Sequence, residues 1–128
     1  MSKQSLCLGK AGEATALNFL KTKGYRILAR NYKTKLGEID IIAVDKDTVC
    51  FVEVKTRTSK RFGLPEEAVC LFKQKQIAKA ALSFLKQNKL LHKKARFDVV
   101  SIIGASQSEA AQIDLIQNAF ELDDSYVY

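Results

Sequence analysis

The sequence has 128 residues, 47% of them hydrophobic and 27% charged, which is typical of a single soluble globular domain spanning residues 1–128. No run approaches the roughly 18 apolar residues of a membrane span, and residues 1–7 lack the apolar core of a signal peptide, so we expect neither membrane association nor secretion. Three cysteines without CxxC spacing and a single histidine argue against a disulfide framework and a zinc site, and favour a cytoplasmic protein.

Charge is distributed unevenly along the chain. All 21 Lys and Arg residues and 8 of the 14 acids lie at or before Arg96, a net charge of +13 (21 − 8), whereas residues 97–128 contain six acids and no basic residue. A domain this basic typically binds a polyanion, so nucleic acid, above all DNA, is the expected partner. A membrane surface is less favoured because no basic amphipathic segment stands out. The remaining explanation for the basic charge is that it only keeps the protein soluble.

Residues 9–23 are predicted to form a helix, because apolar residues recur there at helical spacing and Gly24 supplies a C-terminal stop. Glu13 lies on the same stripe as Leu17 and Leu20, near the predicted N-terminus. Two interpretations of Glu13 stay open. Its carboxylate either complements the helix dipole or reaches a functional site.

Residues 25–32 are predicted to form a strand. Residues 39–44 and 49–54 are predicted to form two further strands, joined by a short polar turn as a hairpin. Charged residues interrupt this hairpin at four positions: Glu38, Asp40, Glu53 and Lys55. Strand side chains alternate between faces, so the two acids of the first strand share a face, as do the acid and the lysine of the second. Charges in buried strands are costly unless they are paired or bind a metal. We therefore favour a metal-dependent site over a structural ion cluster.

Residues 56–63 are predicted to form a polar loop, with basic residues that would either bind phosphates or lie in solvent: Arg57, Lys60 and Arg61. A second helix is predicted from Pro65 to about Asn88. Its predicted apolar side consists of Ala68, Phe72, Ala80, Ala81, Phe84 and Leu85. Lys73 and Gln76 lie beside this side of the helix, and would either reach the site or extend into solvent.

Residues 97–103 are predicted to form a third core strand and residues 113–120 an edge strand. The order of elements implies a mixed α/β fold whose first strands are antiparallel. The helix before residue 97 predicts a right-handed crossover between parallel strands.

Two sets of motifs resemble known proteins. Asp40, followed thirteen positions later by Glu53-Val54-Lys55, resembles the D-(x)n-ExK signature of the restriction-endonuclease-like nuclease superfamily. Five blocks in order resemble the YraN family of small bacterial endonuclease-like proteins, which are related to archaeal Holliday junction resolvases. These blocks are GKAGEATA (9–16), GEIDIIA (37–43), FVEVKTR (51–57), FGLPEEAV (62–69) and RFDVV (96–100). The resemblance spans about residues 9–120.

The resemblance implies a restriction-endonuclease-like three-layer core, in which a mixed central β-sheet is flanked by helices. It also implies acids around a divalent metal, Mg²⁺ or alternatively Mn²⁺. Asp40 and Glu53 match the metal-binding acids of the motif, and Lys55 matches its lysine. The Val54 carbonyl lies between them and is a further candidate ligand.

The same resemblance extends to two more acids and to the assembly. Glu13 matches the additional acid that resolvase-like members contribute from the N-terminal helix, and Glu38 matches the acid of the GEID block. Resolvase relatives imply a homodimer by analogy.

Two functions compete at this point. The first is a Mg²⁺-dependent endonuclease that hydrolyses phosphodiester bonds in nucleic acid, with branched or otherwise structured DNA as the expected substrate. Lys55 would then orient or deprotonate the attacking water. The second is a basic nucleic-acid-binding or recruitment module that does not cleave. The intact set of Asp40, Glu53 and Lys55 favours the first, because a module that only binds would not need acids facing a polyanion.

Overall fold

The computed structural model describes residues 3–57, 71–104 and 112–120, together with the side chains of these segments except those of residues 3–11 and 57. The elements are α1 (Lys3–Thr22), β1 (Arg26–Lys33), β2 (Glu38–Asp45), β3 (Thr48–Arg57), α2 (Leu71–Gln87), β4 (Lys94–Ile103) and β5 (Gln112–Phe120). The described strands form one sheet in the order β1-β2-β3-β4-β5. Within these residues, no helix combines the length and apolar composition that crossing a membrane requires.

The sheet is mixed, as the order of elements predicted. β1, β2 and β3 are antiparallel neighbours, β3 and β4 are parallel, and β5 is antiparallel to β4. The predicted hairpin is confirmed: Asp45 pairs with Thr48, and Lys46 in the turn between them adopts a left-handed φ of 58°. α2 lies between β3 and β4 in the chain, so it supplies the connection that parallel strands require.

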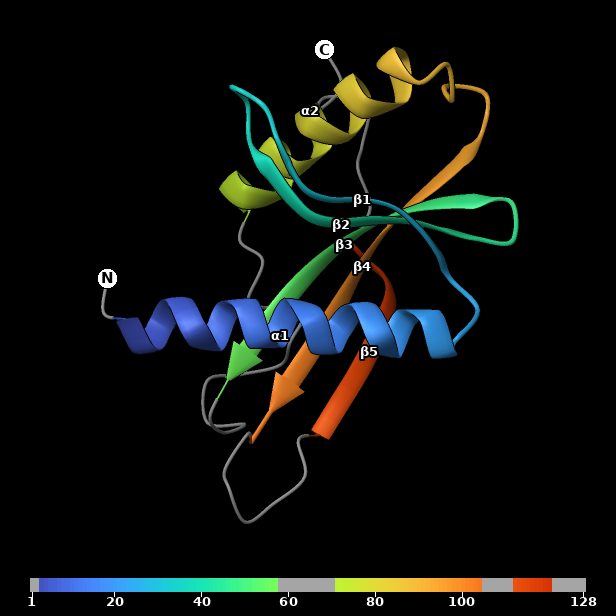
Figure 1. The fold of residues 1–128 in the computed structure, drawn as a ribbon. Helices are drawn as coiled ribbons and strands as arrows, with labels where there is room; N and C mark the ends of the chain where they lie inside the picture. Colours follow the sequence, from blue (N-terminus) through green and yellow to red (C-terminus); the bar gives the residue numbers. More distant parts are fainter. Residues whose placement is uncertain (1–2, 58–70, 105–111, 121–128) are drawn as a thin grey trace.

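One helix covers each face of the sheet, which gives three layers (Figure 1). On one face, α1 packs Ala16, Leu17 and Leu20 against alternate residues of β2, β3 and β4. On the other face, the buried side of α2 packs against the intervening residues, among them Ile42, Phe51 and Phe97. Because successive strand side chains point to opposite faces, the sheet contributes to two separate apolar clusters, one on each face. The three-layer α/β architecture is confirmed.

The prediction that the first helix begins at Gly9 is wrong, because α1 begins at Lys3. A glycine inside a helix costs only about 1 kcal/mol relative to alanine, which does not by itself end a helix. The predicted stop at Gly24 is confirmed by its φ of 91°. Glu13 therefore lies in the third turn of α1, where the helix dipole has little influence.

One other boundary and one helix face differ from prediction. β3 continues to Arg57, where a loop was predicted from residue 56, because parallel pairing with β4 extends to Ile103. Phe72 is 71% exposed, so its placement on the apolar side of α2 is wrong. Burial along α2 begins only at Ile77, where the helix reaches the core cluster. The predicted helix start at Pro65 lies outside the described residues.

A buried ionic network ties the α1 face of the sheet together. Asp98 is fully buried and accepts hydrogen bonds from Arg96 Nε at 2.9 and 3.1 Å and from the Tyr25 hydroxyl at 3.2 Å. A terminal nitrogen of Arg96 donates to the Tyr25 oxygen at 2.7 Å and to Asp45 at 3.0 Å. The backbone N–H of Asn118 donates to Asp98 at 2.9 Å. Each charge has an opposite partner, which is the pattern of a structural ion cluster.

Candidate metal and nucleic-acid site

The sheet forks at the charged residues of the central hairpin. The last paired residues of β2 and β3 are Ile41 and Val52. Beyond them, β2 pairs with β1 and β3 pairs with β4. In place of a backbone carbonyl, the Asp40 carboxylate accepts the N–H of Val54 at 2.8 Å. This side-chain bond links β2 and β3 at the point where their backbone pairing ends. Beyond it, the two strands are no longer paired with each other.

A polar cavity of about 160 Å³ occupies the fork on the α2 face. It is lined by Glu38, Asp40, Glu53, Lys73, Gln76 and Ile77. Asp40 and Glu53 thus share one face at one end of the sheet, as strand alternation predicted. Glu38 is exposed at the rim of the cavity, whereas Glu53 is only 6% exposed.

Two lysines lie on the Glu53 carboxylate. Lys73, from the first turn of the described part of α2, forms an ion pair with Glu53 Oε1. Lys55 Nζ lies 3.6 Å from the same oxygen. Burial, followed by the neighbouring Lys73 ammonium, lowers the pKa of Lys55. For Lys73, burial works to lower the pKa, but the contacts with Glu53 outweigh it and the pKa is raised.

Asp40 is the least compensated acid of the cavity. Burial, followed by repulsion from Glu53, raises its pKa to about 7, although the bond from Val54 works in the opposite direction. Among the described residues, no lysine or arginine nitrogen lies within ion-pair distance of its carboxylate. A cation placed between Asp40 and Glu53 would relieve this repulsion.

Glu13 approaches the same site from α1. Its charge contributes to the raised pKa of Asp40. With its amide nitrogen turned toward Glu13, Asn31 of β1 donates to both carboxylate oxygens, at 3.1 and 3.3 Å. Gly12 allows α1 to come this close, because a Cβ there would collide with Thr56 Oγ1 of β3. α1 therefore delivers a third acid to the region.

The donor set suits a hard divalent cation that keeps part of its water shell. Within the described segments, no group of three or more His, Cys, Asp or Glu side chains has the spacing of a closed metal site. Mg²⁺ commonly takes only one or two carboxylates and retains several waters. Asp40 and Glu53, with the Val54 carbonyl as a further candidate, fit that requirement. They do not fit a four-ligand structural zinc site.

The structure brings together most of the residues that the sequence singled out: Asp40, Glu53, Lys55, Glu13, Glu38, Lys73 and Gln76. The side chain of Arg57, and Lys60 and Arg61 entirely, lie outside what the structure describes. Sequence reasoning missed Asn31, whose positive φ of 50° carries no distinctive sequence signal. It also missed Ser101, which pairs with Lys55 in the β3–β4 ladder. Its buried hydroxyl has no hydrogen-bond partner within the described segments.

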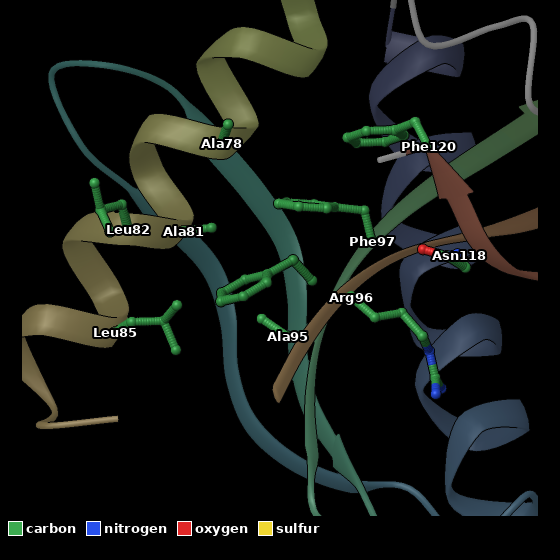
Figure 2. A pocket seen from close by; sticks show the side chains of 10 residues that line it. Ala78, Ala81, Leu82, Leu85, Ala95, Arg96, Phe97, Asn118 and Phe120 are labelled. Carbon is green, nitrogen blue, oxygen red and sulfur yellow. The ribbon is translucent and has the colours of Figure 1, made fainter. Parts of the chain in front are cut away.

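A second cavity, of about 390 Å³, is mainly apolar (Figure 2) and shares no described lining residue with the cavity of Asp40 and Glu53. It lies between α2 and the strands β4 and β5, with Phe97 and Phe120 stacked in its wall. Arg96 contributes to the lining, but its guanidinium points away from the aromatic rings, toward the network around Asp98 (Figure 2). Because the described residues of its lining include no acid, this cavity is not a candidate for the metal site.

Comparison with known families agrees with the motif pattern. The model of UPF0102, described as an uncharacterised protein family, matches residues 12–102, which include Asp40, Glu53 and Lys55. The chain belongs to the UPF0102 family. The YraN-like resemblance drawn from the five sequence blocks is confirmed at this level.

Individual UPF0102 proteins match nearly end to end. The UPF0102 protein of Geobacter metallireducens is 50% identical over 95% of this chain and 98% of its own length. That of Geotalea daltonii is 50% identical over 90% of each chain. The relative from Caldicellulosiruptor saccharolyticus is 47% identical over 88% of this chain and 96% of its own length. The family extends across the whole described fold, and the names of these relatives state no activity.

Proposed function

We propose that this chain is a divalent-metal-dependent endonuclease that hydrolyses phosphodiester bonds, with branched or otherwise structured DNA as its substrate. The observation that carries the proposal is the fork of the sheet, where Asp40 and Glu53 face one polar cavity and, among the described residues, no Lys or Arg nitrogen lies within ion-pair distance of Asp40. A stability-only design would pair or remove such acids, as the network around Asp98 does.

Each residue of the fork has a role in this proposal. Asp40 and Glu53 would hold Mg²⁺ or Mn²⁺, which when bound supplies charge stabilisation and a more acidic water. Lys55, with its lowered pKa, would accept a proton from the attacking water or offset charge on the phosphate. Glu13 would orient a water near Asp40. Lys73 would contact the substrate backbone.

The direct test is cleavage on a panel of labelled substrates: a four-way junction, a flap, a single strand and a duplex. Each is incubated with Mg²⁺, with Mn²⁺ or with EDTA. We expect metal-dependent cleavage that is strongest on one of the branched substrates and absent in EDTA. Tight binding of the panel without cleavage in either metal would instead support the non-cleaving recruitment module, for which the net charge of the first 96 residues is the main argument.

Nucleic-acid binding should depend on Arg57, the last residue of β3, and on two basic residues that follow it in the sequence. Charge reversal of Arg57, Lys60 and Arg61 to Glu should weaken binding of every substrate alike, at least about tenfold at 100 mM salt, and reduce the slope of log K against log[salt]. Fluorescence anisotropy across a salt series measures both quantities.

A matched control reverses the same number of charges elsewhere. Arg26, Lys46 and Lys93 line a cavity at the turn end of the β2–β3 hairpin, at the opposite end of β3 from Glu53. Their reversal should weaken binding much less. Equal losses in the two triple variants would mean that binding follows net charge rather than a defined surface.

A further inference from the structure

We infer that Lys73 competes with the divalent cation for the Glu53 carboxylate, so that metal binding releases its ammonium toward the nucleic acid. Lys73 is then a positioning residue with two alternative partners. This inference rests on the proposed function and adds to it a link between metal loading and substrate contact.

The first step concerns the ammonium groups that already lie on the Glu53 carboxylate. Lys73 Nζ pairs with Oε1 of Glu53, and Lys55 Nζ lies 3.6 Å from that same oxygen. A Mg²⁺ ligand oxygen lies about 2.0–2.1 Å from the metal, closer than any ammonium can approach. A divalent ion bound to Glu53 would bring further positive charge to the carboxylate on which two ammonium groups already lie, and would repel both of them.

The second step concerns which group moves. The side chain of Glu53 is only 7% exposed on β3, whose backbone is fixed by its pairing with β4, so Glu53 has little freedom. The side chain of Lys55 is 23% exposed and also extends from β3. The side chain of Lys73 is 38% exposed and extends from the first turn of α2 into the lining of the cavity. Lys73 is therefore the cation that can leave at the lowest cost.

The third step is the destination of Lys73. A divalent ion between Asp40 and Glu53 repels a nearby ammonium, which would swing outward around its flexible stem. Outward from the cavity is the side from which a polyanion must approach the acids. A released lysine there offers a phosphate contact that the metal-free protein lacks.

The alternative is a permanent ion pair that only fastens α2 to the sheet. In that case, removing Lys73 would lower stability and leave metal affinity unchanged. Competition predicts the opposite response of metal affinity, and the two can be separated without any measurement of cleavage.

The experiment is calorimetric titration of Mn²⁺, without nucleic acid, into the parent protein and the variants Lys73→Met, Lys73→Arg and Lys79→Met. Lys79 is an exposed lysine farther along α2 and serves as the matched control. We expect Lys73→Met to bind Mn²⁺ about 5- to 20-fold more tightly, equivalent to about 1–2 kcal/mol. Lys73→Arg and Lys79→Met should stay within about twofold of the parent. Circular dichroism confirms that each variant is folded.

A second readout follows the released ammonium. In anisotropy with a non-cleavable phosphorothioate substrate, the salt slope of Lys73→Met should be about one unit smaller than that of the parent in Mn²⁺, and equal to it in EDTA. If the parent binds Mn²⁺ and Lys73→Met binds it equally well, competition is refuted while the nuclease proposal stands. If neither protein binds Mn²⁺, the metal site itself is absent and both proposals fail.

Discussion

Replacing Asp40 with asparagine should reduce cleavage of the best substrate at least about 100-fold, and should stabilise the metal-free protein at pH 8 by about 2–4 kcal/mol. Activity falls because the carboxamide is a poor ligand for a hard cation. Stability rises because asparagine keeps an acceptor for the Val54 N–H but removes a buried charge beside Glu53. Initial cleavage rates and urea unfolding in EDTA measure the two effects.

The stability gain should depend on pH. The pKa of Asp40 is about 7 in the folded protein and 3.8 in a model peptide. Between these values the folded state binds the extra proton, so the stability contributed by Asp40 falls as the pH rises through this range. The destabilisation caused by the ionised Asp40 carboxylate is complete above about pH 7. The variant lacks it, so its advantage should be large at pH 8 and small near pH 4.

Asp47→Asn is the matched control for this pair of effects. Asp47 is an exposed acid on the turn of the same hairpin, far along β3 from the fork. Its replacement should change neither cleavage nor the pH profile. Cleavage that survives in Asp40→Asn, or a variant that is less stable than the parent at pH 8, would contradict the assignment of Asp40.

Replacing Asp98 with alanine should cost about 3–5 kcal/mol in the free energy of unfolding, the largest stability effect that we expect. Asp98 is fully buried and is bonded to Arg96, Tyr25 and the N–H of Asn118. Its removal leaves a guanidinium with only Asp45 as an acidic partner, and removes the carboxylate that accepts the Asn118 N–H. Urea unfolding curves with unchanged slopes measure the loss.

Two variants make this prediction specific. Asp98→Asn retains an oxygen acceptor and should lose less. Asp47→Ala removes an exposed acid: the Asp47 side chain is 69% exposed and its carboxylate lies 3.9 Å from Lys94 Nζ. This replacement should cost less than about 1 kcal/mol. An Asp98→Ala protein within 1 kcal/mol of the parent would show that the network contributes little. Together with Asp40→Asn, this series separates the scaffold charges from those of the site.

The convergence of Asp40 and Glu53 was predictable because the length of the hairpin turn fixes which residues of β2 and β3 lie side by side. A two-residue turn that pairs Asp45 with Thr48 sets a register that ends at Ile41 and Val52. The next residue of each strand is Asp40 and Glu53, and residues at matching positions of a hairpin point to the same face. The burial pattern of β2 and β3 was likewise visible as runs of β-branched residues. Local rules were sufficient wherever the turn fixed the register.

The rest depended on contacts between distant segments. Phe72 has helical spacing with the apolar face of α2, but it is exposed and precedes Ile77, where burial along the helix begins, so periodicity misassigned it. Glu13 was ambiguous because the start of α1 was placed too late. The ion pair between Lys73 and Glu53 depends on how α2 rotates over the core, which the position of Lys73 along the helix does not determine.

Paramagnetic broadening by Mn²⁺ tests most directly whether the fork holds a divalent cation. In ¹H–¹⁵N spectra of the labelled protein, the amide signals of Asp40, Glu53 and Val54 should disappear first, at less than one equivalent of Mn²⁺. That of Asp47, at the turn of the hairpin, should persist, and Asp40→Asn should abolish the selective loss. Broadening that is spread evenly over exposed acids, or that begins at Asp47, would contradict a metal site between β2 and β3.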